Sequence, residues 1–277
     1  MRRRGVLGLL LGLAAGTAGC GPGPSGPGPS GPGPSGAGPS GPDPSGAGPS
    51  RAAPTRATAA DYAWFEKNGE LTEGFCFTWV QTLSPEEVLS RLGARDLGVS
   101  RWRAGWFDLP GERRGEVVVA VTRVGGWTLM VEDNGLIGVD DDVVRKLSQG
   151  TRLIANYRNV EYDGEFTLAE GGVVQVSFDP QDPTDRSGAD PDRLLADMKA
   201  VGLDLSGVGR DPADPSYVDA PYTEAAFALT QRVTGLPLTA EVLHSATYRV
   251  GALPDPLAGV GEGDQEPRLQ PGPSQHS

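Results

Sequence analysis

A run of six Gly- and Pro-rich pentapeptides limits which part of this 277-residue chain can fold. Residues 21–50 read GPGPS, GPGPS, GPGPS, GAGPS, GPDPS and GAGPS, with no apolar side chain larger than proline. Such a segment has nothing to bury, and each proline removes a backbone hydrogen-bond donor. We therefore expect residues 21–57 to form a disordered tether. Residues 254–277 are polar, aperiodic and rich in Gly and Pro, and we expect them to form a disordered tail.

The first twenty residues have the layout of an export signal. Three arginines at positions 2–4 precede an apolar stretch at 6–15, which is too short to span a bilayer. The stretch ends in TAGC, and these letters resemble the lipobox of bacterial lipoproteins, in which the cysteine is acylated. The alternatives are a plain secretory peptide and an uncleaved anchor. We expect residues 1–20 to be a signal peptide and Cys20 to carry acyl chains such as palmitate. These would hold the protein on the extracytoplasmic face of the cell membrane.

Residues 58–253 alternate between strand and helix patterns. Apolar side chains at every second position predict strands at 75–80, 117–124, 127–132, 151–160, 165–170 and 173–178, with a shorter one at 136–139. Short Gly-rich turns separate several of them, and strands joined by tight turns must be antiparallel. The strongest hairpin signal is Asn134-Gly135, between the strands at 127–132 and 136–139.

Helix signals lie between these strands. Ser84-Pro85 and Asp140 are predicted to begin two amphipathic helices, and Asp190-Pro191 is predicted to cap a third. Two more helices are expected at 223–234 and 240–246. The pattern predicts a single α+β domain over residues 58–253. It would have a mainly antiparallel sheet of six or seven strands and four or five capped helices.

Six segments of this region also resemble a known family. In order, they read FCFTWV, LSPEEVLSRLGA, GWTLMVEDNG, LSQGTRLIANYRNV, FDPQDPTDRSGADPDRL and TEAAFALTQRVTG. Together they resemble an uncharacterised domain family of GC-rich actinobacteria over roughly residues 60–250. The resemblance implies no activity and no catalytic residues, because the function of that family is not known.

Charge and cysteine content argue against a nucleic-acid partner and against an internal disulfide. The chain carries 24 Lys and Arg against 36 Asp and Glu, a net charge of −12, so nucleic acid is not an expected partner. The basic and aromatic stretch RWRAGW at 101–106 is interpreted as a loop that its tryptophans anchor to the core. With Cys20 acylated, Cys76 has no disulfide partner, and its apolar neighbours suggest a small buried side chain.

The sequence offers little catalytic machinery. The chain has two histidines, His244 and His276, and it lacks the usual zinc, nucleophile-elbow and phosphate-loop motifs, so we expect no cofactor and no catalytic residue. The alternative is a catalytic pair in which Cys76 is the nucleophile and His244 is the base.

Aspartates are concentrated between positions 179 and 219, where ten occur without a glutamate. The preferred interpretation is that they serve turns and caps. A weak calcium site and a glycosidase-like pair of carboxylates are alternatives. The candidate surface for a ligand or a divalent cation consists of Asp179, Asp182, Asp185 and Asp190.

The expected function is that of a membrane-tethered binding module. Its partner would be an unknown envelope protein or ligand, because a flexible arm favours capture of partners near a surface. The acidic region between positions 179 and 219 favours a basic partner or a divalent cation. The alternatives are an envelope hydrolase that uses carboxylates, a structural spacer, and a cytosolic role if the export signal is not used.

Overall fold

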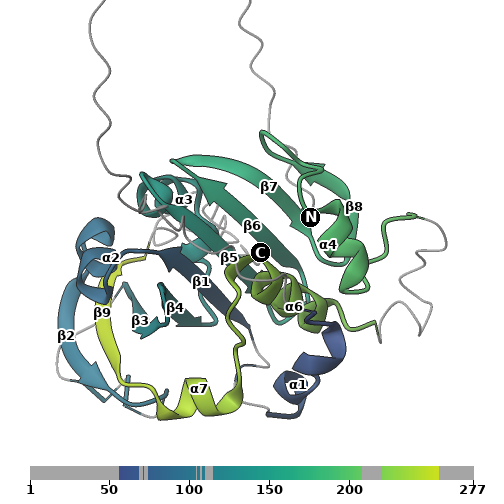
Figure 1. Cartoon of the computed structure of the whole chain (residues 1–277). Coiled ribbons are helices and arrows are strands. Elements are labelled where there is room, and N and C mark those ends of the chain that lie inside the picture. The colour runs from purple at the N-terminus through teal and green to yellow at the C-terminus, as the bar shows by residue number, and fades with distance from the viewer. Residues whose placement is uncertain are drawn as a thin grey trace, which may run out of the picture. The chain divides into compact units, whose positions relative to one another are not determined.

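The computed structural model describes residues 56–68, 71, 74–103, 105–106, 108–109, 115–207 and 220–255. They contain one nine-stranded sheet with the order β2-β9-β3-β4-β1-β5-β6-β7-β8 (Figure 1). All eight neighbouring pairs are antiparallel. The strands are β1 (Phe75–Gln81), β2 (Arg95–Ser100), β3 (Glu116–Val124), β4 (Trp127–Asp133), β5 (Arg152–Arg158), β6 (Gly164–Glu170), β7 (Val173–Asp179), β8 (Asp182–Ser187) and β9 (Tyr248–Pro254).

Within the described ranges there are six α-helices and two 3₁₀ helices. They are η1 (Ala59–Tyr62), α1 (Trp64–Asn68), α2 (Pro85–Leu92), η2 (Ile137–Val139), α3 (Asp141–Ser148), α4 (Leu195–Ala200), α6 (Tyr222–Thr234) and α7 (Ala240–Ser245). The predicted caps of two helices are confirmed. The Ser84 hydroxyl accepts from the Glu87 amide, and the Asp140 carboxylate accepts from the amides of Asp142 and Val143. No helix in these ranges is both long and apolar enough to cross a membrane.

Helices pack on both faces of the sheet, which gives the fold two hydrophobic cores. On one face, here called the α6 face, strand residues such as Phe77 and Trp79 pack with α6, α4, α7 and η1. On the other, the α3 face, strand residues such as Val80 and Met130 pack with α2, α3 and η2. The central strand β1 is buried on both sides, so polar side chains that project from the middle of the sheet are enclosed.

The prediction of an antiparallel α+β fold is confirmed, but the predicted number of strands, six or seven, was wrong, because the sheet has nine. The three strands that the sequence pattern missed are β2, β8 and β9. β2 and β8 form the two edges of the sheet, where one side of a strand stays solvated and the apolar alternation is weak. β8 reads DPTDRS and is mostly exposed. β9 reads YRVGALP and pairs with β3 and β2, far away in the sequence.

The prediction of a strand at 136–139 was also wrong, because Ile137–Val139 form the 3₁₀ helix η2. Asn134-Gly135 therefore does not make the expected hairpin. β4 is already paired on both sides, with β3 and β1, so no edge remains for a following strand. The third helix also differs from its prediction. It begins at Leu195 rather than after Asp190, whose amide instead bonds the carbonyl of Gln175 in β7.

Candidate functional site

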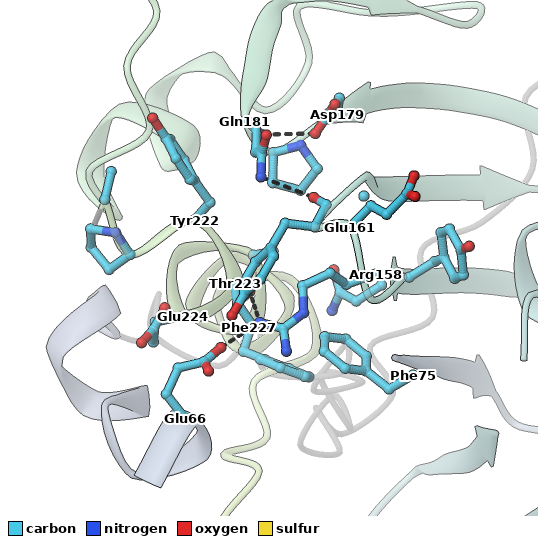
Figure 2. A pocket seen from close by; sticks show the side chains of 18 residues that line it. Glu66, Phe75, Arg158, Glu161, Asp179, Gln181, Tyr222, Thr223, Glu224 and Phe227 are labelled. Carbon is cyan, nitrogen blue, oxygen red and sulfur yellow. Dashed lines mark hydrogen bonds and ion pairs between the residues drawn. The ribbon is translucent and has the colours of Figure 1, made fainter. Parts of the chain in front are cut away.

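A pocket with a volume of about 550 Å³ lies on the α6 face of the sheet. Its walls come from the end of β5, the loop at 159–163, the turn between β7 and β8, and the first turn of α6 (Figure 2). We call it the Arg158 pocket after the buried cation at its centre. Its volume lies in the range of sites that bind small organic molecules.

β5 contributes two polar side chains to the lining of this pocket. Asn156 and Arg158 are two residues apart, so they project from the same face of the strand as Ile154. They are 3% and 4% exposed, respectively. Burial of an amide and a charged guanidinium is costly unless partners compensate for the lost water.

Arg158 is held by one ion pair and two aromatic rings. Its Nη1 donates to Glu66 of α1, and to the Thr223 hydroxyl of α6 at 2.9 Å. The guanidinium lies 5.1 Å from the ring centre of Phe75 and 4.7 Å from that of Tyr162. These contacts fix the cation in place, but both hydrogen bonds use the same nitrogen.

Two buried polar atoms of the pocket have no partner among the described residues, namely Nε of Arg158 and Oδ1 of Asn156. The amide nitrogen of Asn156 is satisfied, because it donates to the Thr230 hydroxyl at 2.6 Å. An unmet buried donor or acceptor costs about 1–3 kcal/mol. A hydrogen donor for Asn156 and an acceptor for Arg158 would relieve both costs, and a bound ligand can supply them.

Four acidic residues also line the pocket, namely Glu66, Glu161, Asp179 and Glu224. Burial raises the pKa of Glu224, and the nearby negative charge of Glu66 raises it further. Figure 2 shows these two glutamates on the side of the pocket where α1 meets α6. The arrangement can bind a cation, or it can hold and release a proton at Glu224.

The rim of the pocket is ordered by its own hydrogen bonds. The Asn159 side chain accepts from the amides of Glu161 and Asp163, both at 2.9 Å, and so closes the loop at 159–163. The amide group of Gln181 donates to the Tyr162 carbonyl at 2.9 Å, which joins this loop to the turn between β7 and β8. The walls are therefore preformed, which reduces the entropy lost when a ligand binds.

A second buried ionisable group lies on the α3 face. Glu132 is 1% exposed, and its two carboxylate oxygens accept from the amides of Ile137 and Gly138, each at 2.8 Å. Cys76, the register partner of Glu132 on β1, and Thr78 pack against Gly138. We call this group the Glu132 cluster. Burial raises the pKa of Glu132 to about 7 and that of the Cys76 thiol well above its ordinary value.

The aspartates singled out in the sequence do not converge on one point. Asp179 ends β7 and lines the Arg158 pocket, whereas Asp182 and Asp185 are exposed on β8 and Asp190 lies in the turn before α4. In the described ranges, no group of three or more His, Cys, Asp or Glu side chains is arranged to hold a metal ion. A cation surface at these residues stays a prediction.

The other sequence candidates are also separated. Cys76 faces the Glu132 cluster, while His244 lies on α7 with its ring 5.7 Å from Trp102 in the core of the α6 face. They therefore do not form a nucleophile and base pair. Trp102 and Trp106 are buried, which confirms that the stretch at 101–106 is anchored by its tryptophans. Cys20 and the predicted signal peptide lie outside the described residues.

Asn156 and Arg158 were not predicted as site residues, although the sequence of β5 carried a signal. In RLIANYR, Asn156 and Arg158 occupy the same face as the apolar Ile154, where a strand in the middle of a sheet would bury them. Buried polar residues of this kind are either paired or functional. The partner Glu66 carried no such signal, because it lies 92 residues away in the sequence.

Residues 55–257 match the model of a family of unknown function, DUF6461. This match covers most of the chain and confirms the resemblance to an uncharacterised family. No curated protein and no solved structure matches the chain.

Proposed function

This chain belongs to the family of unknown function DUF6461, and we propose that it is an exported, lipid-anchored protein whose folded part binds a small molecule in the Arg158 pocket. The observation that carries the proposal is the pair of unmet buried atoms, Nε of Arg158 and Oδ1 of Asn156, in a preformed pocket of about 550 Å³. A purely structural polar group in a core is normally satisfied by its own protein. Both residues line the pocket, so a ligand bound there is the partner we propose for them.

The anchoring part of the proposal rests on the sequence. Acyl chains on Cys20 would hold the protein at the membrane, and the tether at 21–57 would let the binding domain search the space near it. The ligand or partner would then be a component of the envelope. Replacement of Cys20 by alanine should move the protein from the membrane fraction to the soluble fraction. Equal membrane retention by this variant would contradict the anchor.

The pocket is tested by blocking it. Gln181 lines the rim, and Gln181→Trp places a large ring there, while Gln149→Trp makes the same change at an exposed site on the other side of the sheet. We expect native mass spectrometry of the full chain, purified from its own cells, to show a retained small molecule. The molecule should be lost in Gln181→Trp and kept in Gln149→Trp. Retention by both variants, or by no form of the chain, would refute the proposal.

A hydrolase that uses carboxylates is the second candidate, and the raised pKa of Glu224 favours it. A carboxyl that holds its proton can act as a general acid, while the exposed Glu161 on the opposite wall can act as a base. Turnover of the retained molecule, abolished by Glu224→Gln, would support an enzyme. Stable retention without turnover supports the binding module.

A further inference from the structure

The charges around the Arg158 pocket indicate a class of ligand. Among the described lining residues, the charged side chains are the carboxylates of Glu66, Glu161, Asp179 and Glu224 and the guanidinium of Arg158. Four negative charges and one positive charge leave a net charge of −3 when all are ionised. The positive charge is already paired with Glu66 and flanked by two aromatic rings. A ligand therefore meets a negative environment, which repels anions and attracts cations.

We propose that the pocket binds a small organic cation that carries an ammonium group and hydroxyl or carbonyl oxygens. This inference rests on the proposed function and specifies its ligand. The ammonium group lies against Glu224, which lines the pocket on the same side as Glu66, so that two negative charges repel each other there (Figure 2). A cation between these glutamates relieves that repulsion.

The remaining polar atoms explain why the cation must also carry oxygen. Oδ1 of Asn156 needs a hydrogen donor, and Nε of Arg158 needs an acceptor. An ammonium group alone donates but cannot accept, whereas a hydroxyl group does both. The ring of Tyr222, which also lines the pocket (Figure 2), gives such a ligand aromatic surface to contact, and an aromatic face attracts a cation.

Three matched probes test the charge requirement on the full chain. Glucosamine is a hydroxylated amine, glucose is its neutral counterpart, and glucuronate is the anionic counterpart with the same ring. We expect calorimetric titration, at a pH where the amine is protonated, to show that glucosamine binds about tenfold more tightly than glucose. Glucuronate should not bind.

Two isosteric variants locate the interaction. Glu224→Gln removes one charge from the pocket, and Glu241→Gln removes one charge from the exposed surface of α7, outside the pocket. We expect the affinity for glucosamine to fall about tenfold in Glu224→Gln and to stay unchanged in Glu241→Gln. An equal loss in both variants would indicate attraction by the overall negative charge and would overturn the inference.

The remaining outcomes separate the ligand class from the proposed function. Binding of glucose or glucuronate at least as tight as that of glucosamine would overturn the cationic class while leaving a working pocket. Failure of all three probes would also overturn the class. The pocket itself would then be tested by whether the wild type retains a small molecule and Gln181→Trp loses it, a measurement that does not depend on these probes.

Discussion

The two faces of the sheet each bury an ionisable side chain, and the two are satisfied in different ways. On the α3 face, both oxygens of Glu132 accept backbone amides from η2, and the surrounding cluster leaves no room even for a Cβ atom on Gly138. On the α6 face, Arg158 lines a pocket, both of its hydrogen bonds use one nitrogen, and its Nε has no partner among the described residues. The protein itself thus completes the first site and leaves the second incomplete. This difference separates a group that supports the fold from one that is available to a ligand.

The largest expected effect comes from removing the Glu132 side chain. Glu132→Ala leaves two buried amides, those of Ile137 and Gly138, without acceptors, at roughly 1–3 kcal/mol each. We expect the free energy of unfolding to fall by about 4 kcal/mol in urea titrations. Glu132→Gln keeps the volume and one acceptor oxygen, so it should lose less. A loss below about 1 kcal/mol for Glu132→Ala would show that the η2 amides find other partners and that Glu132 does not support the fold as proposed.

The pH dependence of stability should identify the same carboxyl. Its pKa is about 7 in the folded chain against an ordinary value of 4.5, so the folded state holds the proton more tightly. The stabilisation is present below the ordinary value and is lost as pH rises through about 7. The difference is about 3 kcal/mol at 1.36 kcal/mol per pKa unit. The neighbouring Cys76 and Tyr157 have raised pKa values and stay protonated over this range.

The measurement is the unfolding free energy of the wild type and of Glu132→Gln between weakly acidic and weakly alkaline pH. The wild type should become less stable as pH rises, while the variant, which has no proton to lose at this position, should show a flatter profile. Parallel profiles for the two proteins would mean that Glu132 does not titrate in this range.

The smallest expected effect is on the α6 face. The double variant Glu66→Gln and Arg158→Met removes both charges of the ion pair together with the unmet Nε. In this pair Arg158 is buried and Glu66 is half-buried. Replacing a buried ion pair with uncharged side chains of similar volume is often neutral or stabilising. We expect the free energy of unfolding to change by no more than about 1 kcal/mol, in contrast to Glu132→Ala. A loss of about 3 kcal/mol or more would show that Arg158, like Glu132, mainly supports the fold.

Much of the local structure could be predicted because its causes lie within a few residues. The cap at Ser84 and Glu87 is three residues long, and the two-residue period of β1 and the turn at Gly171-Gly172 are equally local. Such signals depend on side-chain chemistry and backbone preference rather than on distant partners. The same locality explains the failure at Asn134-Gly135, where a good turn signal was overridden because β4 already had two neighbours.

The sequence by itself thus determined the antiparallel α+β class, most strands and helices, and the net negative charge. Only the tertiary structure decided the nine-strand order, the enclosure of Glu132 and the assembly of the Arg158 pocket. The pocket brings Glu66, Arg158 and Glu224 together from α1, β5 and α6. The physical reason is that burial and charge pairing depend on which distant segments pack together. A short window of sequence does not contain that information.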